Sequence, residues 1–286
     1  MNKFIPDSEM ILNSDGSIYH LNLKPEHLAS TILTVGDPER VTLISSFFDE
    51  IEIKVSKREF VTHTGWYKGK RLSVMSTGMG TDNIEIFMTE LDALVNVEFS
   101  TRTAKKNHTT LNIIRLGTSG SMQSNIPEGS LLASRYAIGL DTLMTFYKGI
   151  YSDLEMEIGR TVQKKLELPF LPYCVSGSPA LLEKFARGIL KGNTITCPGF
   201  FGPQGREVRL EPRIPHMIEK LSRLRVGEIS FSNFEMETSG YYAMGRLLGH
   251  EVLSLNAIVA NRITKQFTND PDEVVKRLIM HALLLV

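Results

Sequence analysis

Short apolar runs alternate along the chain with longer stretches whose apolar residues recur at helical spacing. TILTV (31–35), LSVMSTG (72–78), LNIIRLG (111–117) and EVLSLNAIVA (251–260) are apolar and rich in β-branched residues, which predicts strands. After the second run, one face of a predicted helix carries Ile84, Phe87, Met88, Leu91 and Val95. The chain therefore alternates between strand and helix.

Capping residues mark where these helices begin and end. Asp37 can cap the helix in DPERVTLISSFF, and Pro38 suits its first turn. The stretch ETSGYYAMGRLLG reads as a helix that ends at Gly249. A last helix is predicted to open at NDPDE, where an aspartate and a proline precede apolar residues at helical spacing.

This alternation predicts an α/β fold with a mixed, mostly parallel central β-sheet flanked by helices. We expect a single domain over residues 1–286, with residues 1–18 as an N-terminal extension. Residues 135–195 are assigned only as helical or loop scaffold. Segment 191–215 is rich in glycine, proline and arginine, so we expect an ordered excursion without regular elements.

Composition narrows the classes of partner. Lys+Arg and Asp+Glu both number 32, so there is no basic excess for nucleic acid. No apolar run approaches the roughly 20 residues that cross a bilayer, and the N-terminus lacks the apolar core of a signal peptide. Cys174 and Cys197 form no CxxC pair, and the histidines show no metal-binding spacing. We expect a cytoplasmic protein without a structural metal.

Glycine turns follow three predicted strands, at 36–40, 78–81 and 117–120. Backbone N–H groups at such turns bind anions, and Arg40 and Arg115 add guanidinium groups. Two of these sites have a plainer interpretation: a capped helix with an exposed Arg40, and a structural ion pair at Arg115. GMGTDN lacks the third glycine of a dinucleotide fingerprint.

Two further motifs suit a nucleoside. Gln204 and Arg206 in FGPQGR could read a flat ring with C=O and N–H groups, beside Phe200 and Phe201. In FEMET (234–238), Glu237 could accept two hydrogen bonds from vicinal hydroxyls. The alternatives are a solvated loop and, for FEMET, carboxylates favoured by a helix N-terminus.

Taken in order, several motifs resemble the nucleoside phosphorylase superfamily and, within it, most closely the uridine phosphorylases. They run from residue 19 to the C-terminal helix: YHLNL, VGDPERV, SKREF, STGMGTDNIEI, IRLGTSGSMQ, the QGR loop, NFEMETSGYYAMG and IVANR. The resemblance implies reversible phosphorolysis of uridine, with deoxyuridine as an alternative substrate, to uracil and the pentose 1-phosphate.

The resemblance also implies a role for individual residues. Phosphate would be held by Gly36, Arg40, Arg115 and Thr118, joined by Arg58 of a neighbouring subunit. Ribose would be held by Met236, Glu237 and Arg115, with His20 of the neighbour at the 5′-hydroxyl. The base would meet Ser119, Gly120, Phe200, Gln204, Arg206, Glu235 and Arg262. Catalysis would rest on Arg115, Gln204, Arg206 and Glu237.

The chain departs from family patterns at three places. Purine-cleaving relatives have an aspartate as general acid where this chain has Asn261, which favours pyrimidines. The base-binding loop usually reads PGQ-x-R, whereas this chain has GPQGR. The family's monovalent-cation site falls at Glu59, Met79 and Asn83, where the asparagine replaces the usual hydroxyl residue and argues against potassium.

The family further implies no organic cofactor, phosphate as co-substrate and a homo-oligomer with sites shared across a dimer, as a hexamer of three dimers. Three other functions stay open. They are a purine nucleoside phosphorylase or nucleosidase of the same superfamily, a non-catalytic nucleoside-binding protein, and a dinucleotide-dependent reductase.

Overall fold

The computed structural model describes residues 3–286, which form two compact units. The first contains residues up to 114 together with 244–251, and the second contains 115–243 together with 252–286. The expectation of one domain over the whole chain stays a prediction.

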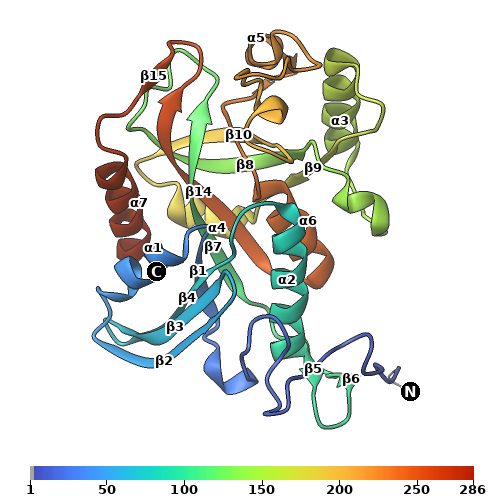
Figure 1. The fold of residues 1–286 in the computed structure, drawn as a ribbon, viewed down its shortest axis with the longest axis vertical. Coiled ribbons are helices and arrows are strands. Elements are labelled where there is room, and N and C mark those ends of the chain that lie inside the picture. The colour runs from blue at the N-terminus through green and yellow to red at the C-terminus, as the bar shows by residue number, and fades with distance from the viewer. Residues whose placement is uncertain (1–2) are drawn as a thin grey trace. The chain divides into compact units, whose positions relative to one another are not determined.

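The first unit is built on a four-stranded sheet (Figure 1). Strand β1 pairs with β4 in parallel, and β4, β3 and β2 follow one another as antiparallel neighbours. Its elements are η1 (Pro25–His27), β1 (Thr31–Val35), α1 (Pro38–Ser45), β2 (Glu50–Lys57), β3 (Phe60–Tyr67), β4 (Lys70–Ser76), α2 (Thr81–Asn96), β5 (Val97–Glu98) and β6 (Thr103–Ala104). Strand β7 (Asn112–Ser121) begins here and continues in the second unit, whereas α6 (Thr238–Leu248) begins in the second unit and ends here.

Local signals place the helices of the first unit as predicted. The Asp37 carboxylate accepts the Glu39 N–H at 2.9 Å, which satisfies a donor at the start of α1. On α2, the predicted apolar face is buried at Ile84, Phe87, Met88 and Leu91. Helix α6 ends one residue before Gly249, whose φ of 75° is the left-handed conformation that glycine adopts easily.

The second unit carries parallel strands at its centre. Strand β10 pairs in parallel with β8 and β13, and β7, β9 and β14 add antiparallel neighbours to this set. Its elements are β8 (Leu131–Gly139), η2 (Leu143–Phe146), α3 (Asp153–Leu166), β9 (Tyr173–Ser176), α4 (Pro179–Phe185), β10 (Leu190–Thr196), η3 (Gly202–Gln204), α5 (Met217–Ser222), β11 (Arg225–Val226), β12 (Ile229–Ser230), β13 (Asn233–Glu235), β14 (Glu251–Asn261), β15 (Gln266–Phe267) and α7 (Pro271–Leu285).

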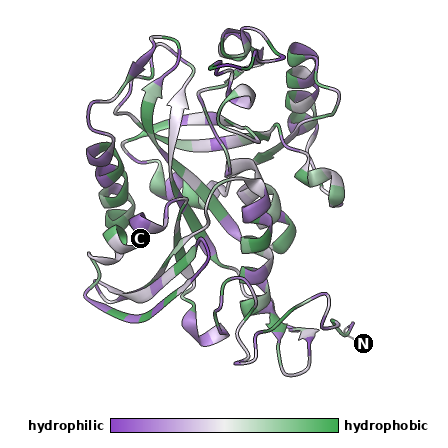
Figure 2. Ribbon diagram, viewed as in Figure 1, coloured by the Kyte–Doolittle hydropathy of each residue, from purple (hydrophilic) through white to green (hydrophobic). Residues whose placement is uncertain are grey.

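Both the capping signals and the apolar pattern of the last helix are confirmed. Asp270 accepts the Glu273 N–H at 2.9 Å, and α7 buries Val274, Leu278 and Ile279 on one face. Figure 2 shows hydrophilic and hydrophobic segments alternating along α7, as expected of a helix with one buried face. The α/β fold with a mixed sheet and flanking helices is likewise confirmed.

Three local expectations are wrong. GTSG (117–120) is no turn: β7 runs on to Ser121, because its end pairs with β13 at Phe234 and Asn233. Residues 190–196, assigned in part to the irregular excursion, form β10, and its register with β8 shifts between Gly192 and Asn193. Residues 135–195 contain strands as well as helices. Long-range pairing decides each case, and no local signal reports it.

Candidate active site

A buried charged cluster joins strand β7 to the start of helix α6. Arg115 projects from β7, and its Nη2 lies 2.5 Å from Glu237 Oε2 and 2.9 Å from Glu235 Oε2. Its Nη1 donates to Ser254 Oγ at 3.2 Å and to Asn256 Oδ1 at 3.3 Å. The structure therefore brings together three of the residues predicted to bind substrate.

The protonation of this cluster follows from its charges. Burial alone lowers the pKa of Arg115, but the Glu235 and Glu237 carboxylates outweigh that effect and raise the pKa above its usual value. Arg115 is only 5% exposed, so water screens these contacts weakly. One guanidinium faces two carboxylates, and the group carries a net negative charge when both are ionised.

The Glu235 carboxylate mainly accepts hydrogen bonds from backbone N–H groups. It accepts the N–H groups of Glu237 and Thr238, each at 2.9 Å, and the Thr196 hydroxyl at 2.7 Å. These bonds satisfy donors at the start of α6, which no other part of the helix can reach. Its predicted contact with a base stays untested, and the observed bonds give it the task of holding Glu237 and Arg115 in place.

Close approach of the Arg115 side chain depends on Gly117. A Cβ at position 117 would lie 2.0 Å from Arg115 Nη1 and 2.4 Å from Cζ. Only glycine leaves room for the guanidinium to fold back against its own strand. The glycine that we expected to make a turn thus allows an ion pair.

The neighbouring predicted residues lie on the same two segments. Thr118 and Met236 are half-buried, and Ser119 is buried with its Oγ accepting Asn233 Nδ2 at 2.9 Å. A Cβ on Gly120 would lie at 3.4 Å from the Phe234 ring, an ordinary contact. These residues lie on the segments that carry Arg115 and Glu237.

The loop after β10 groups the predicted base-binding residues. Arg206 Nη1 donates to Gln204 Oε1 and to the Phe200 carbonyl, both at 2.6 Å, and the guanidinium lies over the Phe200 ring at 3.7 Å from its centroid. Arg262 Nη1 donates to the Gln204 carbonyl at 3.3 Å. Four residues predicted for one task are therefore held in one connected group.

Arg206, in this loop, lies near a second cation, Arg262, which follows β14. Burial and then the charge of Arg262 lower the pKa of Arg206 to about 10, and burial lowers the pKa of Arg262. An anion placed beside both would relieve this repulsion.

A cavity of about 750 Å³ opens beside Arg206. Its lining is mostly apolar and comes from the loop at 198–214 together with Leu140, Leu168, Phe170 and Met217. Phe201 lines it, but Phe200 does not, because that ring stacks on Arg206. The expected aromatic lining is thus supplied by Phe170 and Phe201.

Asn261 has no hydrogen-bonding capacity left for a ligand. Its Nδ2 donates to the carbonyls of Gln123 and Ile126 at 2.9 and 3.0 Å. Its Oδ1 accepts the N–H groups of Ile263 and Thr264 at 2.9 and 3.0 Å. An amide offers two donors and two acceptor sites, and all four are used here.

The remaining predicted residues belong to the first unit. Gly36 separates β1 from α1, and a Cβ there would approach the Gly78 carbonyl at 3.2 Å. Arg40, on α1, lies 3.9 Å from Asp37. Arg58 is exposed in the β2–β3 turn with a φ of 56°. His20 precedes the buried Leu21 and contacts Glu90 of α2. The structure thus distributes the predicted phosphate residues over both units.

The positions proposed for a monovalent cation lie around one glycine. A Cβ on Gly78 would meet Asn83 Nδ2 at 2.6 Å and Glu59 Cγ at 3.0 Å, so both side chains crowd this backbone. Met79 is 73% exposed. The expectation that potassium does not bind here stays a prediction.

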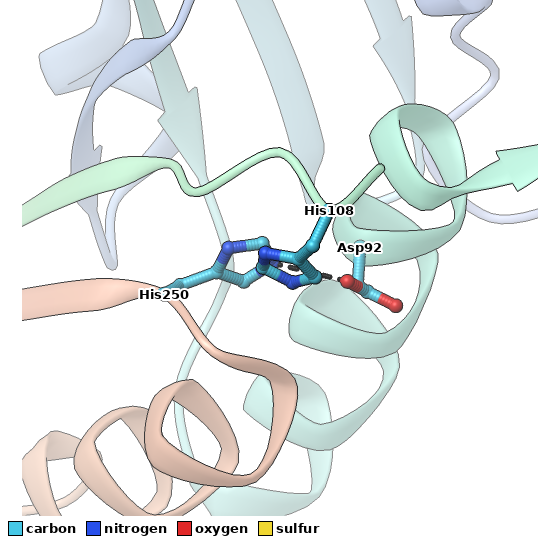
Figure 3. Close-up of side chains that lie close together, drawn as sticks. All are labelled: Asp92, His108 and His250. Atoms are coloured by element: carbon cyan, nitrogen blue, oxygen red, sulfur yellow. Dashed lines mark ion pairs between the residues drawn. The ribbon is translucent and has the colours of Figure 1, made fainter. Parts of the chain in front are cut away.

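Among residues 3–286, the one group of side chains with the spacing of a metal site is Asp92, His108 and His250. Figure 3 shows the two imidazole rings beside one another, with Asp92 reaching them from α2. His250 Nδ1 accepts the Leu111 N–H at 3.2 Å. A neutral imidazole with Nδ1 as acceptor carries its proton on Nε2, which lies 3.3 Å from Asp92 Oδ1.

In this tautomer, Nε2 of His250 carries a proton and has no free lone pair for a metal. His108 Nε2 lies 2.8 Å from the Leu248 carbonyl, which can only accept, so His108 donates there. Asp92 Oδ1 also accepts Asn96 Nδ2 at 2.6 Å. We interpret the group as a set of structural polar contacts that connects α2 with the 105–111 segment and residues 248–250. The expectation of no metal stays a prediction.

Several residues at these sites had no sequence signal that we recognised. Ser254 and Asn256 lie two apart in the apolar strand β14 and share one face, a pattern that could have revealed an interior polar partner. Asp141 is buried and receives the Tyr173 hydroxyl at 2.8 Å, and burial raises its pKa. Asp141 follows β8, and because we did not predict that strand, we could not predict the position of Asp141.

No helix among residues 3–286 has the length and apolar character to cross a membrane.

Comparisons with known proteins identify the family of this chain. Residues 30–286 match the family model described as the phosphorylase superfamily. A uridine phosphorylase of Thermococcus kodakarensis is 30% identical, over 93% of this chain and 84% of its own length. A DeoD-type purine nucleoside phosphorylase of Chromobacterium violaceum is 28% identical, over 82% of this chain and 83% of its own length.

Among solved structures, a Trypanosoma brucei nucleoside phosphorylase that shows uridine phosphorylase activity superposes with a TM-score of 0.87. It is 30% identical, and the match covers 97% of this chain and 100% of that one. Because the family model spans most of the sequence, the chain belongs to the phosphorylase superfamily.

Proposed function

We propose that the protein is a uridine phosphorylase, which converts uridine and phosphate to uracil and ribose 1-phosphate. The observation that carries the proposal is the group formed by Gln204, Arg206 and Arg262, in which two cations adjoin an amide. Such a group suits a ring that bears C=O and N–H groups and leaves as an anion. The Thermococcus and Trypanosoma relatives support the same substrate.

In the proposed reaction, a phosphate oxygen attacks C1′ as the bond from C1′ to N1 of uracil breaks. The electron pair of that bond goes to the base, whose negative charge Arg206 and Arg262 stabilise. The ribose passes through an oxocarbenium-like state beside the phosphate dianion. Each bond change is balanced without a covalent enzyme intermediate or an organic cofactor.

The charged cluster would hold the sugar. Glu237 would accept hydrogen bonds from the ribose hydroxyls, with Met236 against the sugar face. Glu235 accepts the backbone N–H of Glu237 and Arg115 pairs with its carboxylate, so Glu237 needs little reorganisation when substrate binds. Phosphate would meet Gly36, Arg40, Thr118 and Arg115.

Arg58 and His20 would reach the site of a neighbouring subunit. The smallest active species should therefore be a dimer, and we propose a hexamer of three such dimers in the cytoplasm, serving pyrimidine salvage. Sedimentation velocity at assay concentration tests this arrangement, and an active monomer would contradict it.

A purine nucleoside phosphorylase is the second candidate, since one relative carries that name. The saturated hydrogen bonding of Asn261 argues against it, because that side chain cannot protonate a purine. A nucleosidase would have little use for the predicted phosphate residues. A non-catalytic binder should lack part of the site, whereas this chain has residues predicted to bind phosphate, ribose and base.

The deciding experiment measures uracil release from uridine with and without phosphate, beside hypoxanthine release from inosine. Phosphate-dependent cleavage of uridine alone is the expected result. Cleavage of inosine would favour the purine enzyme, and release without phosphate would indicate a nucleosidase. Binding without any cleavage would support the non-catalytic protein.

A further inference from the structure

Glu90 holds the segment that carries His20 through several contacts at once. Its two oxygens lie 3.0 and 2.9 Å from the His20 backbone nitrogen, and Oε2 accepts the Leu21 N–H at 2.9 Å. The same carboxylate approaches the His20 ring, with Oε1 2.6 Å from Nδ1. These contacts restrain both the backbone and the ring of His20.

The segment is restrained from the other side as well. Leu21 and Leu23 are fully buried. Lys57 Nζ donates to the Tyr19 carbonyl at 2.5 Å and to Asn13 Oδ1 at 3.0 Å. With its backbone fixed on both sides, the His20 ring has little freedom, although its side chain stays 26% exposed.

The contact with Glu90 selects one form of the ring. A carboxylate accepts hydrogen bonds, so the short contact places a proton on Nδ1 of His20. In the neutral ring, the lone pair is then on Nε2, at the edge turned away from Glu90. In this neutral form, the exposed edge of His20 is a hydrogen-bond acceptor.

We propose that Glu90 is a positioning residue that makes His20 an acceptor for the 5′-hydroxyl of the nucleoside. This inference rests on the proposed function, in which His20 meets that hydroxyl in the neighbouring subunit's site. It adds a specificity: the enzyme selects substrates with a hydrogen-bond donor at the 5′ position. A 5′-deoxy or 5′-O-methyl nucleoside supplies no such donor.

The kinetic test compares kcat/KM for uridine, 5′-deoxyuridine and 5′-O-methyluridine. In the wild-type enzyme, uridine should exceed 5′-deoxyuridine by about 2- to 12-fold, the range for one neutral hydrogen bond. The 5′-O-methyl compound should do no better than the 5′-deoxy compound, because an ether oxygen only accepts.

The variant Glu90→Gln tests whether Glu90 sets the tautomer of His20 or only stabilises the segment around it. The glutamine carbonyl can still accept the backbone N–H groups, while its NH₂ group faces Nδ1 and favours the tautomer with the proton on Nε2. His20 then becomes a donor, and 5′-O-methyluridine should gain about 2- to 12-fold over 5′-deoxyuridine. In a His20→Ala background, Glu90→Gln should leave that ratio unchanged.

An unchanged ratio of the two analogues in Glu90→Gln would overturn the proposal, since a structural role lowers both equally. Nitrogen NMR of histidine-labelled wild-type protein checks the tautomer even if the variant fails to fold. The His20 resonances, identified by their loss in His20→Ala, should show protonated Nδ1, and protonated Nε2 alone would refute the assignment. If uridine itself is not cleaved with phosphate, the proposed function fails instead.

Discussion

Replacing Gly117 by alanine tests whether the Arg115 cluster is as rigid as its contacts indicate. The added Cβ would lie 2.0 Å from Nη1, whereas ordinary contact begins at 3.4 Å, so the guanidinium must retreat by about 1.4 Å. A flexible arginine could move cheaply. This one is held by Glu235, Glu237, Ser254 and Asn256, and no retreat of that size preserves all its contacts.

The expected loss follows from leaving buried carboxylates without their cation. Breaking a buried ion pair costs about 3–5 kcal/mol. For a chain of this size that corresponds to a fall in Tm of about 5–8 °C. We also expect kcat/KM for uridine to fall by about 100-fold, because Glu237 loses its orientation.

Differential scanning calorimetry and initial-rate kinetics measure both effects. Gly202→Ala is the matched control for stability, because a Cβ there meets nothing within 4 Å, and its Tm should stay within about 2 °C of wild type. Arg115→Met should cost little more in the Gly117→Ala background, since the pairing is already lost. A Tm for Gly117→Ala equal to that of the control would refute the reasoning.

Three further predictions test other parts of the structure. Arg206→Ala should lower kcat/KM for uridine by about 100-fold and leave the KM for phosphate within about threefold of wild type, as measured by initial rates. If uridine turnover and phosphate binding weaken equally, the assignment of Arg206 to the base is wrong. Asn261→Asp removes two donors to backbone carbonyls. Denaturant titrations should therefore show the free energy of unfolding falling by about 2 kcal/mol or more. If this variant gains inosine cleavage, the position is catalytic after all. Burial and then Lys54 lower the pKa of His63, so the unfolded chain binds a proton more readily below about pH 6.5, and stability falls as the pH drops through the folded pKa. His63→Gln has no imidazole to titrate. In thermal melts, the Tm of this variant relative to wild type should rise as the pH falls from 6.5 to 5, and a Tm difference that does not change with pH would contradict the assignment.

Much of the candidate site was visible in short motifs. FEMET and the QGR loop contain residue types that are unusual in their setting, and Arg115 ends an apolar run where a charge needs an explanation. The structure connects these residues by contacts that no spacing reports. The alternative interpretation of Arg115 as a structural ion pair is correct as far as its contacts go, and its task in phosphate binding stays a prediction.

The sequence alone determined the elements whose signals are local. Strand β1, helices α1, α2, α6 and α7, and strand β14 follow from apolar periodicity and from caps such as Asp37 and Asp270, because each depends on neighbours a few residues away. Tertiary structure decided the rest. Strand β7 continues through GTSG because β13 pairs with it, and the Glu235 carboxylate bonds both the start of α6 and the distant Thr196 hydroxyl. Gly117 matters only because Arg115 folds back over it. Such outcomes depend on groups distant in sequence, whose approach only the folded chain defines.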